Sequence, residues 1–175
     1  MTEDSARMQE KLQRKLFREN LHRIWMLAKE GQLNGLTAKE RELAEILLDH
    51  QEYGSHFENT DILDGREYEA GATFNPFLHI STHRMVEDQL AAEAPIETVL
   101  FCESLEDRGL SRHDAIHFVI MILLHVLYGS AASGRSFDAG RYRRLLEECR
   151  GVEPERIEGI IEQDLSEYPD QRDLQ

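Results

Sequence analysis

Apolar residues recur at intervals of three and four along most of the chain, and they rarely alternate with polar residues as in a half-buried β-strand. In the first long segment, Phe17, Leu21, Ile24 and Ala28 fall on one helical face, and Gly31 ends the pattern. The same spacing predicts helices over residues 8–29, 37–50, 76–93, 95–109, 111–128, 138–149 and 154–165. We therefore predict an all-α fold, a bundle of about six to seven helices.

Residue types at the helix starts support these boundaries. Thr37 followed by Glu40 matches a capping box, in which each side chain satisfies a backbone donor at the helix start. Asn75-Pro76 supplies an N-cap and then a proline at the first helical position, where its missing N–H is harmless. Ser111 is a further N-cap before the most apolar segment. These residues indicate three helix starts independently of the periodicity.

The longest apolar run extends from Phe118 to Leu124 and continues past His125 to Leu127. At about ten residues it has half the length needed to cross a bilayer, so no membrane-spanning segment is predicted. Because the run is apolar on nearly all sides, other helices must surround it. We expect this helix at the centre of the bundle.

A chain of 175 residues can bury a core without disulfide bonds or structural metal ions, and one helical domain over residues 1–175 is expected, with two packed sub-bundles as the alternative. The periodicity disappears among Gly, Asp, Asn and Ser from residue 54 to residue 73, which predicts a loop there. The acidic end, from about residue 166, is expected to fray.

Composition narrows the class of function. The formal net charge of −14 argues against nucleic acid as a partner, because the phosphate backbone would be repelled. The sequence has no Gly-rich phosphate loop, so no nucleotide cofactor is expected. The N-terminus lacks an apolar signal-peptide core, and the two cysteines, Cys102 and Cys149, are too few for a disulfide framework. A cytoplasmic location is predicted, and a protein partner or a homo-oligomer stays open.

Histidines gather in the middle of the chain and form two helix-spaced pairs, His79 with His83 and His113 with His117. Residues four apart on a helix project from one face, and Glu87 extends the first pair by a further turn. Imidazole is a good ligand for transition metals, and a rigid helix holds two imidazoles in one direction. These five residues are the first candidates for a metal site.

Further candidates lie near these pairs. His50 shares a face with Leu43 and Leu47 at a helix end, so we expect it to point inward as an additional ligand. Glu52 and His56 follow it and are secondary candidates, with Glu52 open to metal binding, a hydrogen bond to a ligand, or simple solvation. His125 is also secondary. It is either a ligand at a second metal or a core histidine hydrogen-bonded to a neighbouring helix, because a buried imidazole needs a partner.

Several segments combine these residues: His50-Gln51-Glu52-Tyr53, Asn75-Pro76-Phe77-Leu78-His79 with His83, Glu87-x-Gln89, and His113-x-x-x-His117. Together they resemble a bacterial family of unknown function marked by H-P-E-Y-H, N-P-F-L-H and H-E-x-x-H-like elements. Gln51 stands in place of the proline, Gly54-Ser55 separates Tyr53 from His56, and Asp114 stands where the third element has Glu. The resemblance implies a helical fold and a clustered His/carboxylate site, with no established activity. In architecture the paired ligands are also similar to the sites of hemerythrin-like bundles.

Two functions compete on this evidence. The first is a metal-binding helical protein, whose His/carboxylate set suits iron, zinc, nickel or manganese better than calcium. An open coordination position would allow hydrolytic or dioxygen chemistry, with Glu52 or Glu87 as proton acceptor, and the sequence does not decide whether there is a reaction. The alternative is a non-enzymatic helical interaction protein with a buried histidine hydrogen-bond network.

Overall fold

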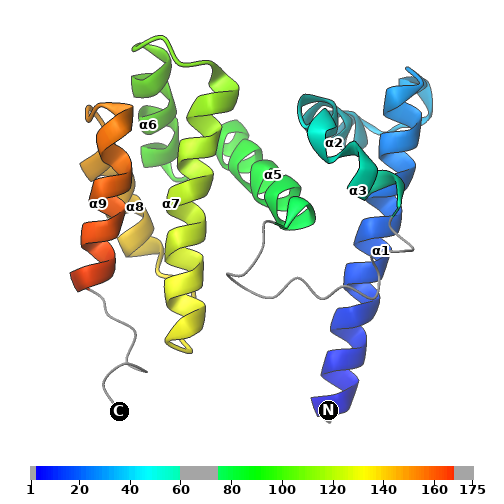
Figure 1. Cartoon of the computed structure of the whole chain (residues 1–175), viewed down its shortest axis with the longest axis horizontal. Helices are drawn as coiled ribbons and strands as arrows, with labels where there is room; N and C mark the ends of the chain where they lie inside the picture. Colours follow the sequence, from blue (N-terminus) through cyan, green and yellow to red (C-terminus); the bar gives the residue numbers. More distant parts are fainter. Residues whose placement is uncertain (1–2, 60–74, 168–175) are drawn as a thin grey trace. The chain divides into compact units, whose positions relative to one another are not determined.

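The computed structural model describes residues 3–59 and 75–167, and every regular element in these ranges is helical (Figure 1). The α-helices are α1 (Glu3–Lys29), α2 (Ala38–Asp49), α3 (Gly54–Glu58), α5 (Pro76–Ala92), α6 (Ile96–Glu106), α7 (Arg112–Ala132), α8 (Ala139–Cys149) and α9 (Pro154–Glu167). Single 3₁₀ turns cover Leu33–Gly35 and Gln51–Tyr53. The predicted all-α class is confirmed, and each predicted helix has a counterpart.

The chain divides into two compact units, Met1–Ser81 and Thr82–Gln175, and the boundary falls within α5. Each unit has its own apolar core: one draws on buried residues between Leu21 and Ile80, the other on buried residues between Val86 and Ile161. Each unit is described by itself below. The expectation of one domain over residues 1–175 stays a prediction, because compact packing units need not fold independently.

In the first unit, α1 packs against α2 and α3. The amphipathic stripe predicted for α1 is buried, and Leu21 and Ile24 have no exposed surface. At the start of α2, Thr37 accepts a hydrogen bond from the Glu40 backbone N–H, and the Glu40 carboxylate accepts one from the Thr37 N–H at 2.8 Å. The predicted capping box is therefore confirmed.

Helix α3 occupies Gly54–Glu58, where the sequence predicts the beginning of a loop. Burial explains the difference. Phe57 has no exposed surface and meets the Trp25 ring edge-on, with ring centroids 5.6 Å apart. Gly54 lies so close to the same indole that an added Cβ would be 2.8 Å from a ring carbon. Tertiary packing on Trp25 thus orders one helical turn that lacks a periodic pattern of its own, and residues 60–73 of the predicted loop lie outside the described residues.

In the second unit, α7 packs against α6 and α8, and α8 packs against α9. Val119, Ile122 and Val126 on α7 have no exposed surface. This agrees with the expected apolar core helix. Ser111 caps the helix as predicted, with its hydroxyl oxygen accepting from the Asp114 backbone N–H at 3.1 Å.

Helix α7 continues to Ala132, four residues beyond the predicted end at Tyr128. The Gly-Ser-Ala composition of this segment predicts a loop, but Ser130 is buried and the helix ends instead at Ser133, whose hydroxyl donates to the Gly129 carbonyl at 2.8 Å. Packing therefore overrides the weak helix propensity of the segment.

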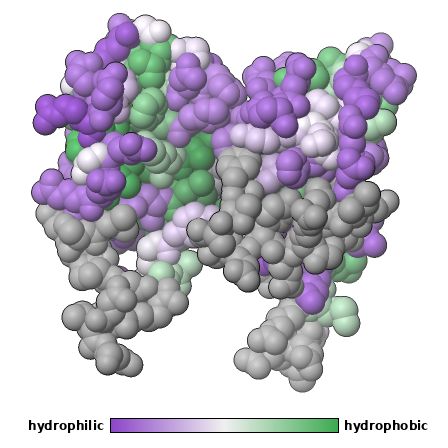
Figure 2. All heavy atoms as spheres, viewed as in Figure 1, coloured by the Kyte–Doolittle hydropathy of each residue, from purple (hydrophilic) through white to green (hydrophobic). Residues whose placement is uncertain are grey.

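The full length of α7, Arg112–Ala132, is long and apolar enough to cross a membrane by length and composition, although its apolar run alone is too short. Of its most apolar window, 44% is buried inside the structure. On the face drawn in Figure 2, hydrophilic side chains cover much of the coloured surface.

The chain's last described helix, α9, runs to Glu167, so the first two residues of the segment expected to fray are helical. Residues 168–175 lie outside the described ranges.

Candidate metal centre

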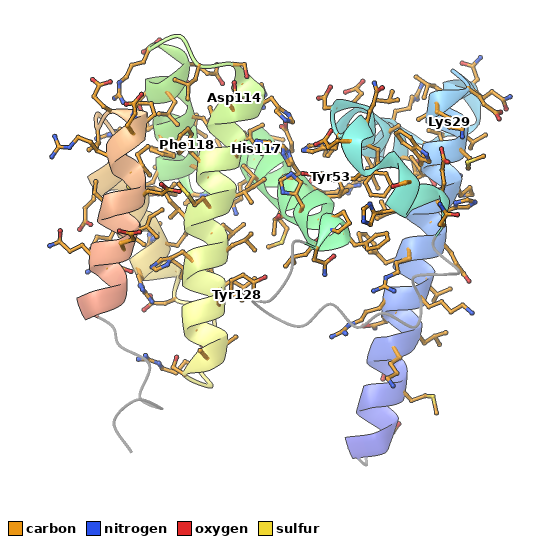
Figure 3. All side chains as sticks on the ribbon, viewed as in Figure 1. Lys29, Tyr53, Asp114, His117, Phe118 and Tyr128 are labelled. Atoms are coloured by element: carbon orange, nitrogen blue, oxygen red, sulfur yellow. The ribbon has the colours of Figure 1, made fainter. Side chains whose placement is uncertain are left out.

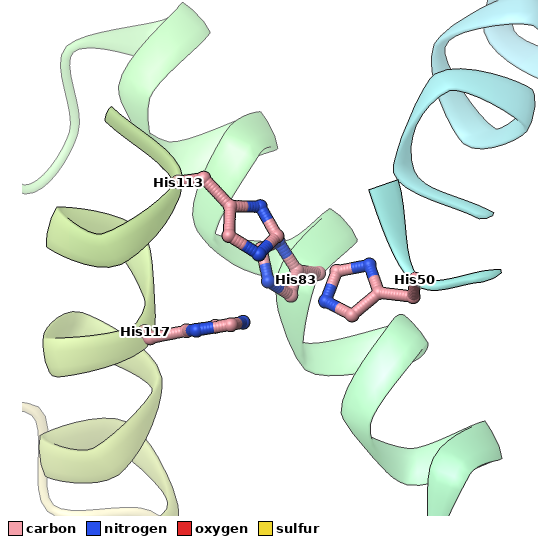
Figure 4. A group of neighbouring side chains, drawn as sticks. All are labelled: His50, His83, His113 and His117. Carbon is pink, nitrogen blue, oxygen red and sulfur yellow. The ribbon is translucent and has the colours of Figure 1, made fainter. Parts of the chain in front are cut away.

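Three histidines of the second unit converge: His83 from α5, and His113 and His117 from α7 (Figure 4). Their ring centroids are 5.2 Å apart for His83 and His113, 4.8 Å for His83 and His117, and 4.3 Å for His113 and His117. The atoms through which these rings could bind an ion all lie within 4.8 Å of one another. We call these three residues the histidine triad.

The start of α7 and the four-residue spacing of its two histidines determine where these members of the triad lie. Ser111 caps α7, so His113 falls in the first turn and His117 follows one turn later on the same face. Figure 3 shows His117 on the side of α7 that faces α5, with Phe118 directed away from it. His83 is only 2% exposed, whereas His113 and His117 are half-buried. A buried imidazole and two half-buried ones give a site that an ion can reach from solvent.

Glu87 lies one turn after His83, as the sequence predicts, but its carboxylate accepts a hydrogen bond from Arg112 at 2.9 Å. Arg112 directly precedes His113. Among the described residues, the group of mutually close ligand atoms contains no carboxylate. The structure therefore places Glu87 beside the triad, in an ion pair that ties α5 to the start of α7.

A second contact between helices lies one and a half turns after His83. The Gln89 side-chain oxygen accepts two hydrogen bonds, one from the Thr98 hydroxyl of α6 and one from the Tyr142 hydroxyl of α8, both at 2.9 Å. Burial raises the pKa of Tyr142 to about 12, so its hydroxyl keeps the proton that it donates. Gln89 thereby connects α5 to two neighbouring helices of the unit.

In the first unit, His50 and His79 form a pair, with their Nε2 atoms 2.9 Å apart. His50 is 1% exposed, and its Nδ1 lies 2.7 Å from the Ile46 carbonyl, which can only accept. We therefore assign the proton of neutral His50 to Nδ1, and His79 donates from Nε2 to the lone pair on His50 Nε2. The Tyr53 ring flanks both, with centroids 6.0 Å from His50 and 5.8 Å from His79.

The secondary candidates Glu52 and His56 do not belong to the group of mutually close ligand atoms. Glu52 is exposed in the 3₁₀ turn Gln51–Tyr53. His56 is half-buried on α3, and its Nδ1 has no hydrogen-bond partner among the described residues. His22, which has no partner at helical spacing in the sequence, lies 2.8 Å from the Phe57 carbonyl through its Nδ1.

His125 belongs to a different group in the second unit. Its Nε2 lies 2.8 Å from the Asp164 carboxylate and 3.0 Å from Arg141 Nη2. Asp164 also accepts from Arg141 Nε at 2.7 Å and from Arg144 at 2.9 Å. Burial alone would raise the pKa of Asp164, but the hydrogen bonds from Arg141 and His125 outweigh it, so the pKa lies below its ordinary value. We call these four residues the Asp164 network.

Sequence reasoning missed Asp164, Arg141 and Arg144. The available signal was the buried position of His125, which calls for a polar partner, but the sequence gives no indication of which residue supplies it.

The two cysteines, Cys102 and Cys149, are buried and unbonded. Burial raises the pKa of Cys102 to about 12 and that of Cys149 to about 11. Both thiols therefore stay protonated at neutral pH, a form that is a poor metal ligand. The candidate site uses nitrogen ligands.

Comparison with known proteins identifies a family and no function. A search of curated proteins and a search of solved structures each found no significant match. A family model described as a domain of unknown function, DUF1841, matches residues 13–148, a range that includes both histidine groups and most of the Asp164 network. The match covers well over half of the 175 residues, and the chain therefore belongs to the DUF1841 family, a domain of unknown function.

Proposed function

We propose that the protein binds a transition-metal ion through the histidine triad. The observation that carries this proposal is the convergence of three imidazoles from two helices, with ligand atoms within 4.8 Å of one another. Three nitrogen ligands around one zinc ion at about 2.1 Å would lie about 3.4 Å apart, or about 3 Å apart around an octahedral ion. Side-chain rotations that bring the ligand atoms closer by roughly an ångström would therefore let the triad bind an ion.

The types of ligand atom limit which metal ions the site could bind. Three neutral imidazoles suit iron, zinc, nickel or manganese, whereas calcium requires oxygen ligands. With three protein ligands, an ion keeps at least one coordination position for water or a substrate. Water bound there would lose a proton more readily than bulk water, and Glu87, one helical turn after His83 and paired with Arg112, is a candidate proton acceptor. We infer a metal site capable of hydrolytic or dioxygen chemistry.

His50 and His79 are proposed as further ligands, as the sequence predicts. The hydrogen bond from His50 Nδ1 to a backbone carbonyl is the contact that orients most metal-binding histidines. The 2.9 Å separation of the two Nε2 atoms is close to that of two imidazoles bound at a right angle to one ion. A metal would displace the proton that His79 places between them.

Metal analysis of tag-free protein tests the proposal. We expect close to one ion per chain by elemental analysis, and a visible absorption spectrum of nitrogen-ligated cobalt after Co²⁺ substitution. His83→Gln and His113→Gln should each remove the ion, because each takes away one of the three imidazoles of the triad. His22→Gln is the matched control, since His22 bonds to a backbone carbonyl and is not among the mutually close ligand atoms, and it should keep the ion.

His50→Gln and His79→Gln test separately whether these two histidines are also ligands. Loss of a second ion in these variants alone would assign the pair a site of its own, and loss of the same single ion would assign all five histidines to one ion. Unchanged metal content would remove His50 and His79 from the ligand set. If metal content is low and does not fall in His83→Gln or His113→Gln, with folding checked by circular dichroism, the triad is not a metal site.

A further inference from the structure

A second candidate site lies in the same unit, where α7 ends and α8 begins. A cavity of about 380 Å³ opens there, and its lining includes Gly129, Ser133, Arg135, Ser136, Phe137 and Arg141. This volume falls within the range of small-molecule sites, roughly 300–1,000 Å³. The lining is mostly polar, with hydroxyl and guanidinium donors, and it shares no residue with the histidine triad.

The local charge is opposite to that of the chain. Residues 135–144 contain four arginines and one aspartate, although the whole chain carries a net charge of −14. The one aspartate, Asp138, lines the cavity, and its carboxylate accepts from the Arg141 backbone N–H at 2.9 Å as the N-cap of α8. This carboxylate keeps its charge, so the cavity wall carries two basic side chains, Arg135 and Arg141, and one acidic side chain. A basic hollow in an acidic protein attracts small anions to that place.

Arg141 is positioned in the cavity wall by two contacts. Its side chain is 8% exposed, and its Nε and Nη2 donate to Asp164. Its Nη1 lies against Gly129, 2.9 Å from the position that an added Cβ would take. A glycine at this point of α7 therefore lets the guanidinium approach the helix. Asp164 also accepts from Arg144, which forms a second ion pair with Glu148 at 3.7 Å, so the carboxylate of Asp164 is available to hold Arg141 in place.

We propose that this cavity binds a small organic anion. A carboxylate or phosphate group would accept hydrogen bonds from Arg135 and Arg141 and from the hydroxyl of Ser136. Phe137 is 39% exposed at the same cavity and would cover an apolar or aromatic part of the ligand. The ligand class is therefore a small molecule with one anionic group and an apolar body.

Binding of three anions to the full chain tests this proposal: inorganic phosphate, phenyl phosphate and benzoate, each against chloride at equal ionic strength. Chemical shifts of backbone amides would be followed by NMR. We expect saturable shifts confined to residues 129–141, with phenyl phosphate binding more tightly than phosphate because of Phe137. Tighter binding of benzoate than phenyl phosphate would identify a carboxylate ligand, and the reverse order a phosphate ligand.

Variants distinguish specific binding in the cavity from non-specific attraction of anions to basic side chains. Arg135→Gln should weaken phenyl phosphate binding about tenfold, the worth of one charge-assisted hydrogen bond. Gly129→Ala should also weaken binding, because the added methyl displaces Arg141. Arg143→Gln is the matched control, since Arg143 is exposed on the same helix and does not line the cavity. Equal loss in Arg143→Gln, shifts spread over the surface, or no saturable shift would each overturn the proposal. His83→Gln should leave anion binding unchanged, which keeps this test independent of the metal site.

Discussion

The Asp164 network allows a quantitative test of what holds the second unit together. Replacing Asp164 by asparagine keeps the size of the side chain and removes its charge. The Arg141 guanidinium, with 8% of its side chain exposed, would then remain buried without its counter-charge, whereas Arg144, 40% exposed, can return to solvent. Removing one partner of a buried ion pair costs about 3–5 kcal/mol, so we expect the free energy of unfolding to fall by that amount.

Urea unfolding followed by circular dichroism measures the effect. A loss of about 4 kcal/mol lowers the urea midpoint by more than about 1 M for a slope of 1–3 kcal/mol per M. Glu162→Gln is the matched control, because Glu162 is exposed on the same helix, and it should change the stability by less than about 0.5 kcal/mol. A cost below about 1 kcal/mol for Asp164→Asn would refute the reasoning, since it would mean that water screens the network.

Two further measurements follow from the same network. The double variant Asp164→Leu with Arg141→Met removes both charges, and it should be more stable than Asp164→Asn, because no buried charge is left uncompensated. The depressed pKa of Asp164 also fixes the sign of a pH effect. Its contribution is present above the pKa of the unfolded chain and is lost as the pH falls through the lower pKa of the folded protein. Asp164→Asn should therefore flatten the acid limb of the stability profile.

The remaining predictions concern an alkaline titration, a close contact and metal removal. Burial raises the pKa of Tyr142 from 10.0 to about 12, so the unfolded chain ionises first and the protein should lose up to about 3 kcal/mol as the pH rises from 10 to 12. In urea titrations at each pH, Tyr142→Phe should lack that loss of stability. If its free energy of unfolding falls between pH 10 and pH 12 as steeply as that of the unaltered protein, the assignment is contradicted. Gly54→Ala should destabilise the protein by about 1–3 kcal/mol, because the new methyl meets Trp25 at 2.8 Å, whereas Gly35→Ala, with open space around it, should not. Zn²⁺ at about a hundred times its dissociation constant should add about 2.7 kcal/mol of stability, measured as a rise in melting temperature that a chelator reverses.

The sequence predicted the helices best where their ends carry specific residues. Thr37 with Glu40 and Ser111 occupy the caps that their side chains suggest, because capping depends on contacts within a few residues. Helix α3 was missed for the opposite reason. Its order comes from Phe57 packing on Trp25, a residue more than thirty positions away in the sequence.

The same distinction applies to the candidate site. The spacing of His113 and His117 places both on one face of a helix, but their approach to His83 depends on how α5 and α7 pack, which no local pattern encodes. Glu87 has the correct spacing for a ligand, yet Arg112 competes for its carboxylate. A basic residue directly before His113 was the available warning.

The double hydrogen bond at Gln89 has a consequence for the angular position of α5. Apolar contacts define the rotation of a helix about its own axis less sharply than directional hydrogen bonds do. A turn of about 15° would move an atom that lies about 6 Å from the axis by roughly 1.6 Å. Such a displacement would separate His83 from the two rings of α7. With Thr98 and Tyr142 both directed at one amide oxygen six residues after His83, α5 has a single rotational setting, and the geometry of the triad depends on that setting.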